Sequence, residues 1–172
     1  MRQVPARRRL FAATVAASLV LLSPPDARAQ APVIAPAPAE LALSGRVAQP
    51  RTISLANLQA MPAVTVEVAH TGPQGVQPSR FKGVLLWPLV QAAAPVDENG
   101  PRTHLRHTLL ALGRDGYGVA LAIGELDPNF EGKKVLVAYA QDGKSLPGLR
   151  LVVPDDARAG RSVRDLVAIE VH

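Results

Sequence analysis

The sequence predicts an α+β fold in which a mixed, mostly antiparallel, barrel-like β-sheet is accompanied by a few short helices. Strict alternation of apolar and polar residues from Val64 to His70 is typical of a half-buried strand. Two pairs, Asp115-Gly116 and Asp142-Gly143, are flanked by aliphatic runs and predict tight hairpins. The 16 prolines exclude a bundle of long helices, and an aromatic content of 3% requires an aliphatic core.

The other elements follow from local patterns, taken in chain order. Ser54 caps a short helix over residues 54–59, which ends at Met61-Pro62. A second helix covers residues 86–93 and is interrupted early by Pro88, and residues 124–127 form a single turn. Runs rich in β-branched and aliphatic residues predict further strands at 108–112, 117–122, 135–139, 149–153 and 167–171.

The N-terminal region has the three parts of a signal peptide, predicted at residues 1–29. Arginines at 7–9 precede an apolar run at 10–22, and the small-residue pattern Ala27-Arg28-Ala29 follows. The run is too short to span a bilayer, so we expect no stable membrane anchor after cleavage. Arg8-Arg9 is compatible with export by either the twin-arginine or the Sec route, and we expect a periplasmic protein. Residues 30–40 form a Pro/Ala-rich linker, and residues 41–172 form the folded domain.

Charge and cysteine content exclude several classes of function. The formal net charge of +5 is concentrated in residues 1–29, which hold five arginines and one acid, so the rest of the chain is close to neutral. Such a domain has no electrostatic basis for binding nucleic acid. The chain contains no cysteine, which excludes disulfides, thiolate metal sites, iron–sulfur clusters and cysteine nucleophiles.

A few residues are candidates for binding. His70 is expected at the sheet rim, followed by a Gly/Pro-rich loop over residues 71–79, where it either contacts a ligand or hydrogen-bonds its own loop. The pattern His104-Leu-Arg-His107 is interpreted as a surface segment rather than a zinc site, because no third ligand is evident. Four arginines would form a phosphoanion pocket if they converge and are otherwise solvated surface charges: Arg80, Arg150, Arg161 and Arg164.

The order of motifs from residue 41 to residue 171 resembles the sulfite-oxidase-like molybdopterin-binding domain. The matching segments are Leu43-Ser-Gly-Arg-Val47, Ile53-Ser-Leu-Ala-Asn-Leu58, Met61-Pro62, Val64-Thr-Val-Glu-Val68, Phe81-Lys-Gly-Val-Leu-Leu86, Asp115-Gly-Tyr117, Asp142-Gly-Lys-Ser-Leu146 and Arg150-Leu-Val-Val-Pro154. The resemblance implies an α+β fold with a barrel-like sheet. It also implies a molybdopterin cofactor that carries molybdenum, and oxygen-atom or electron transfer by secreted bacterial oxidoreductases.

The chain departs from this family at the metal ligand. In catalytic members a strand-end cysteine ligates molybdenum, and the best register places Val68 at that position. A valine has no lone pair to offer a metal. The resemblance implies cofactor contacts at the five candidates His70, Arg80, Arg150, Arg161 and Arg164.

Three functions remain open from the sequence. The first is a periplasmic oxidoreductase-like protein that binds a molybdopterin-type cofactor, with a small anionic substrate. The second is a cofactor-free binding module of the same fold that recognises a small anion or a periplasmic redox partner. The third is a structural domain positioned in the envelope by its linker.

Overall fold

The structure is a computed structural model that describes residues 39–72 and 75–172. The predicted signal peptide (1–29) and nearly all of the predicted linker (30–40) lie outside the described residues. The first strand begins at Glu40, close to the predicted start of the domain. Within the described ranges, no helix has the length and apolar character needed to cross a membrane.

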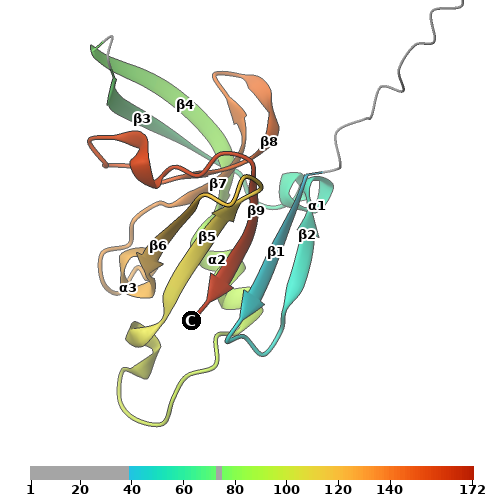
Figure 1. Cartoon of the computed structure of the whole chain (residues 1–172), viewed down its shortest axis with the longest axis vertical. Helices are drawn as coiled ribbons and strands as arrows, with labels where there is room; N and C mark the ends of the chain where they lie inside the picture. The colour runs from blue at the N-terminus through green and yellow to red at the C-terminus, as the bar shows by residue number, and fades with distance from the viewer. Residues whose placement is uncertain (1–38, 73–74) are drawn as a thin grey trace, which may run out of the picture. The chain divides into compact units, whose positions relative to one another are not determined.

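Five strands form the first sheet, in the order β2-β1-β9-β5-β6 (Figure 1). Strands β1 and β9 run parallel, whereas the other neighbours are antiparallel. The predicted hairpin at Asp115-Gly116 is confirmed, since it connects β5 to β6. The bounds are β1 Glu40–Gly45, β2 Arg51–Ser54, β5 Thr108–Gly113, β6 Gly118–Ala122 and β9 Leu166–Val171.

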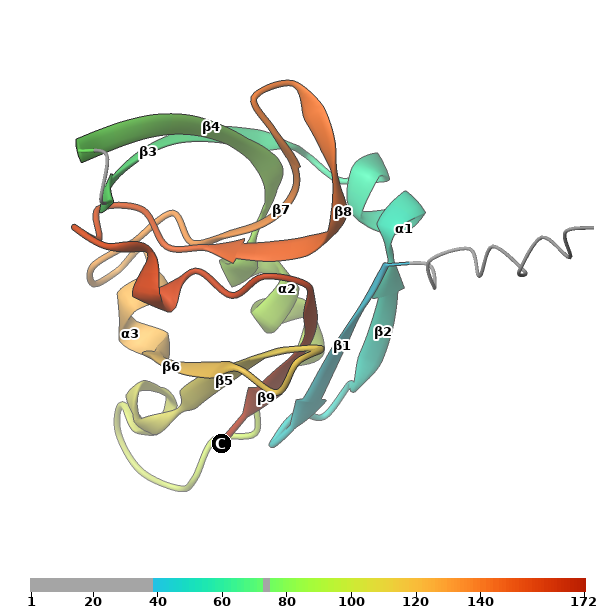
Figure 2. The same cartoon turned by 45° about the horizontal axis from the view of Figure 1, so that its top comes forward.

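Four strands form the second sheet, in the order β3-β4-β7-β8, and all its neighbours are antiparallel. The predicted hairpin at Asp142-Gly143 is confirmed, since it connects β7 to β8. Figure 2 shows how strongly the long β3–β4 pair curves. The bounds are β3 Val64–Gly72, β4 Gly75–Leu85, β7 Leu136–Gln141 and β8 Lys144–Val152.

The loop predicted over residues 71–79 is wrong. Strand β3 runs on to Gly72, and β4 begins at Gly75, so most of this stretch is a long hairpin. The ladder pairs His70 with Gln77 and Thr71 with Val76. The glycine and proline residues of this stretch are typical of an open loop, and for that reason the strand pattern was missed. In the structure, the described ones lie in the paired strands β3 and β4.

The fold class predicted from the sequence is confirmed, although the strands form two sheets instead of one closed barrel. The main core lies between the sheets and includes Leu43 and Ile169 from the first sheet and Val137 and Leu151 from the second. A smaller apolar cluster uses the opposite face of the second sheet and includes Val66, Val68 and Phe81. Strand β7 is therefore largely buried on both faces, whereas β3 exposes Thr65 and Glu67 on one of its faces.

The helices are short and lie close to their predicted positions. Helix α1 (Leu55–Ala60) begins at Ser54, whose Oγ accepts a hydrogen bond from the Asn57 backbone N–H at 3.3 Å. Helix α2 (Leu86–Ala93) packs into the main core, and Pro88 lies in its first turn, where no N–H is needed. Helix α3 spans Ile123–Leu126, and 3₁₀ turns cover Thr103–Arg106 and Ala159–Arg161.

The interpretation of residues 104–107 as a surface segment is wrong for His107, which is only 3% exposed. Its Nε2 lies 2.9 Å from Asp97 Oδ1, and its Nδ1 lies 3.2 Å from the carbonyl oxygen of His172. Both ring nitrogens therefore have partners, which allows a polar ring to be buried. His104 lies in the preceding 3₁₀ turn, 3.9 Å from Asp127 Oδ2.

Candidate functional site

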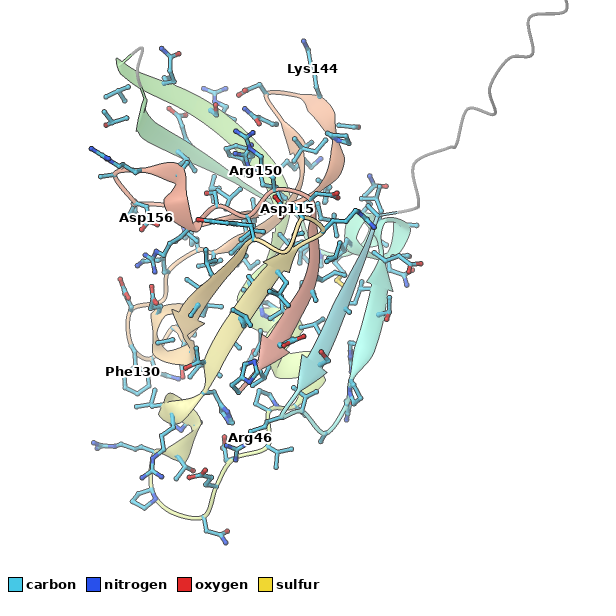
Figure 3. The ribbon with its side chains drawn as sticks, viewed as in Figure 1. Arg46, Asp115, Phe130, Lys144, Arg150 and Asp156 are labelled. Atoms are coloured by element: carbon cyan, nitrogen blue, oxygen red, sulfur yellow. The ribbon has the colours of Figure 1, made fainter. Side chains whose placement is uncertain are left out.

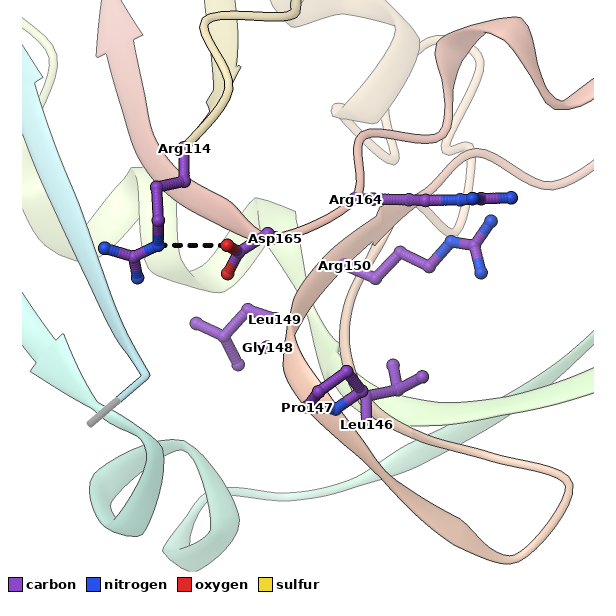
Figure 4. A pocket seen from close by; sticks show the side chains of 8 residues that line it. All are labelled: Arg114, Leu146, Pro147, Gly148, Leu149, Arg150, Arg164 and Asp165. Carbon is purple, nitrogen blue, oxygen red and sulfur yellow. Dashed lines mark hydrogen bonds and ion pairs between the residues drawn. The ribbon is translucent and has the colours of Figure 1, made fainter. Parts of the chain in front are cut away.

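A cavity of about 670 Å³ lies where the second sheet meets the segment that enters β9 (Figure 4). A backbone hydrogen bond from Leu151 N–H to the carbonyl of Val163, 2.9 Å long, holds β8 against that segment. The lining comes from the end of β5, from β8 and from the residues before β9, and consists of Arg114, Leu146, Pro147, Gly148, Leu149, Arg150, Arg164 and Asp165.

Asp165 is paired with Arg114 at one end of this cavity. Arg114 Nε donates to Asp165 Oδ2 at 2.9 Å, and the Arg114 backbone N–H donates to the Asp165 carbonyl at the same distance. Gly148 passes so close that a side chain there would overlap Asp165 Oδ1. Asp165 therefore neutralises Arg114, and glycine at 148 makes room for this arrangement.

Arg150 is a half-buried cation on β8. Its side chain extends from the face of the strand opposite to Leu149 and Leu151, which belong to the main core. Its guanidinium carbon lies 5.3 Å from the centre of the Phe81 ring, and its Nη1 donates to Gln141 Oε1 at 3.3 Å. Its Nε is shielded from solvent and has no hydrogen-bond partner among the described residues. Such a buried, unused donor calls for an acceptor.

Arg164 lies beside Arg150. Figure 4 shows the two guanidinium groups extending in the same direction, away from the Arg114–Asp165 pair. Burial lowers the pKa of the Arg150 guanidinium from its ordinary value, and the positive charge of Arg164 lowers it further. In the part of the chain that the structure covers, neither arginine forms an ion pair with a carboxylate. This end of the cavity is therefore suited to bind an anion.

Arg161 is committed to a different set of contacts. It makes a two-point ion pair with Asp156, at 2.9 Å from Nε and 2.7 Å from Nη2. Its Nη1 donates to Glu125 Oε2 at 2.8 Å, and Lys133 Nζ lies 3.2 Å from the same oxygen. The hydrogen bonds that Arg161 donates to Asp156 and Glu125 raise its pKa, and the guanidinium stays charged. These contacts fasten the segment before β9 to helix α3.

Arg80 is not part of the cavity lining either. Arg80 adjoins Phe81 in β4, so the two side chains lie on opposite faces of the sheet. Arg150 contacts the Phe81 ring and is therefore on the face opposite to Arg80. Arg80 Nε pairs with Glu67 Oε2 at 3.3 Å, and both side chains are mostly exposed. The backbone of His70 lies in β3, but its side chain is outside the described part of the structure. Of the four candidates whose side chains the structure describes, it brings together Arg150 and Arg164.

Sequence reasoning missed the residues that shape this pair. Gln141 holds Arg150, Phe81 lies under it, and Gly148 allows Asp165 to approach. The alternation Leu149-Arg150-Leu151 was the available signal, because it predicts an arginine on the face opposite two core leucines. Figure 3 shows the result, with Arg150 inside the fold and Lys144 of the same strand at the hairpin end.

The side chains at this site fit the phosphate of a molybdopterin cofactor better than they fit its metal. Two arginines without carboxylate partners, one of them with a buried free donor, suit a phosphate group. For the metal, the chain offers no thiolate, and Val68 is 3% exposed within the smaller apolar cluster. Among the described residues, no group of three or more His, Asp or Glu side chains is arranged to hold a metal ion.

Comparison with known proteins gives a family and a fold. Residues 28–172 match the model of the oxidoreductase molybdopterin binding domain. The solved structures that the chain resembles include the sulfane dehydrogenase SoxCD of Paracoccus pantotrophus, with a TM-score of 0.62 and 19% sequence identity. That match covers 78% of this chain and 38% of the other, so the chain spans well under half of that protein. No curated protein matches the sequence.

Proposed function

Because the chain belongs to the oxidoreductase molybdopterin-binding domain family, we propose that it binds a molybdopterin-type cofactor, with Arg150 and Arg164 at the phosphate. The observation that carries this proposal is the half-buried Arg150, whose Nε lacks an acceptor and whose neighbour is a second arginine. When bound, the cofactor would supply a molybdenum centre for oxygen-atom or electron transfer. The residues 1–29 support a periplasmic setting for this activity.

The residues of the chain would bind and orient the phosphate. The guanidinium groups of Arg150 and Arg164 would donate charge-assisted hydrogen bonds to its oxygens. Gln141 and the Phe81 ring already hold Arg150 in one orientation, which reduces the entropy lost on binding. The Arg114–Asp165 pair would close the far end of the cavity to a second anion.

The metal would be held without a protein thiolate. Since the chain contains no cysteine, the pterin dithiolene would provide the sulfur ligands by itself.

Charge reversal at the two arginines tests the proposal. Arg150→Glu and Arg164→Glu should each abolish retention of the cofactor while the far-UV circular dichroism spectrum stays that of the wild type. The readouts are molybdenum by elemental analysis and released pterin by fluorescence, on protein purified from its native periplasm. Lys144→Glu makes a comparable charge change at the exposed end of the same strand and should retain the cofactor. Unchanged pterin content in both arginine variants would refute the assignment.

A cofactor-free binding module is the second candidate. The absence of any cysteine and the largely apolar lining around two arginines favour a pocket for a small anion or for an anionic group of a redox partner protein. The same protein samples distinguish a cofactor-binding protein from a cofactor-free module. If the wild type contains neither molybdenum nor pterin, yet phosphate or sulfate raises its Tm and not that of Arg150→Glu, the protein is such a module.

A further inference from the structure

A second cavity, of about 320 Å³, lies where β2, the end of α1, the start of β3, the end of β4 and helix α2 meet. Its wall is apolar and includes the side chains of Ile53, Met61, Val84 and Leu89. Among the described residues that line it, Arg51 is the only charged one. An apolar wall with one well-placed polar group is typical of sites that bind small molecules.

Arg51 lines this cavity and carries its charge. It lies two residues before the buried Ile53 in β2, and therefore on the same face of the strand. Its Nη2 donates to Gln49 Oε1 at 2.9 Å, whereas its Nε is shielded from solvent and has no acceptor within the described part of the chain. No described carboxylate forms an ion pair with Arg51. An arginine without an ion-pair partner beside an apolar cavity is suited to bind the carboxylate of a ligand.

We propose that this cavity binds a small amphipathic carboxylate. The carboxylate would accept charge-assisted hydrogen bonds from the Arg51 guanidinium, and the hydrocarbon tail would lie against Met61 and Leu89. A volume of 320 Å³ holds about ten groups the size of a water molecule. A saturated acid of the length of octanoate has this size. The proposal is independent of the function proposed above, because the two cavities share no lining residue.

An inward-facing charge on an edge strand has another known use, which is to prevent pairing with a second chain. Strand β2 is an edge of the first sheet, so Arg51 meets that description. This use explains the charge, but it does not explain the apolar cavity beside the charge. The two explanations predict different results for ligand binding.

Titration calorimetry with octanoate tests the proposal. The wild type should bind octanoate saturably at one site, and octanol, which lacks the charge, should bind at least about tenfold more weakly. Arg51→Gln should also lose about tenfold or more in octanoate affinity. Ala92→Phe, at an exposed position of α2 on the cavity rim, should block binding of both compounds by filling the space. Lys144→Glu, at the exposed hairpin end of β8 and outside both cavities, should bind octanoate as the wild type does.

Several results would overturn the proposal. One is the absence of saturable octanoate binding; another is equal affinity of the wild type for octanoate and octanol. Wild-type affinity in a folded Arg51→Gln variant would exclude the arginine as the carboxylate site. If that variant does not fold, Ala92→Phe and the comparison with octanol decide whether this cavity binds the carboxylate. Self-association of Arg51→Gln, together with no octanoate binding by the wild type, would assign Arg51 to edge protection alone.

Discussion

Gly148 is the residue on which the geometry of the arginine cavity depends most directly. A methyl group at this position would overlap Asp165 Oδ1, and Asp165 is held by two contacts with Arg114. We therefore expect Gly148→Ala to disrupt the Arg114–Asp165 pair and to lower the free energy of unfolding by about 1–3 kcal/mol. Urea denaturation measures this loss. Because Arg164 precedes Asp165, the variant should also retain less cofactor or bind anions more weakly.

Gly160→Ala is the matched control. No described atom lies within 4 Å of the position that its Cβ would occupy, so the same substitution should leave stability unchanged within about 0.5 kcal/mol. Equal stability of Gly148→Ala and the wild type would show that Asp165 moves aside freely. The close approach of Gly148 to Asp165 would then not determine the geometry of the site.

At the same scale, the sequence predicted which residue types matter but not which of them are free. Arg161 is engaged by Glu125, 36 positions away along the chain, and Arg80 by Glu67 across a hairpin. Ion pairs between residues so far apart depend on tertiary structure, which no local pattern encodes. Arg150 and Arg164 were therefore named for their chemistry, and only the fold separates them from Arg80 and Arg161.

Elements were predicted well where one side-chain pattern decided them. Alternation found the start of β3, the Asp-Gly pairs found two hairpins, and Ser54 found the start of α1. The β3–β4 hairpin and the burial of His107 were missed for related reasons. In the hairpin, backbone pairing determines the structure of a stretch rich in Gly and Pro. For His107, hydrogen-bond partners at Asp97 and His172 allow the ring to be buried. The sequence alone predicts that a polar histidine is exposed, because it does not show these partners.

The segment before β9 is fastened by an ion-pair network, and its stability should depend on pH. Burial raises the pKa of Glu125, but hydrogen bonds from Arg161, the Ala122 N–H and Lys133 outweigh burial, so the pKa lies below the ordinary 4.5. A carboxyl with a lowered pKa in the folded state stabilises the fold above its ordinary pKa, and this contribution is lost as pH falls through the lowered value. Near neutral pH, we expect Glu125→Gln to cost about 1–2 kcal/mol of unfolding free energy.

The difference between Glu125→Gln and the wild type should shrink as the pH falls below 4.5 and through the lowered pKa, because the carboxylate then becomes protonated. Urea denaturation at neutral pH and at a series of acid pH values gives the comparison. Glu40→Gln makes the same chemical change at an exposed position of β1, outside the network, and should have little effect at any of these pH values. A cost for Glu125→Gln that is the same at all of these pH values would show that the side chain matters for packing and not for its charge.

At the scale of the whole molecule, the two sheets share one core. Leu43 from the first sheet and Leu151 from the second are both at most 1% exposed and belong to the same apolar cluster. The arginine cavity lies at the junction of these sheets, since β8 belongs to one and the segment entering β9 leads into the other. Its geometry therefore depends on both sheets folding together.

This shared core predicts a single unfolding transition. Leu43→Ala and Leu151→Ala should each lower the free energy of unfolding by about 2–5 kcal/mol, through lost burial and the cavity left behind. Because each leucine supports the core of both sheets, each variant should shift the whole transition. Far-ultraviolet circular dichroism and tryptophan fluorescence from Trp87 in α2 should give coincident urea curves in the wild type and in both variants.

Val76→Ala, at a position that is 61% exposed, should leave the midpoint unchanged. If Leu43→Ala instead produced two resolved transitions, the sheets would be separate folding units, and the arginine pair would form only after they dock.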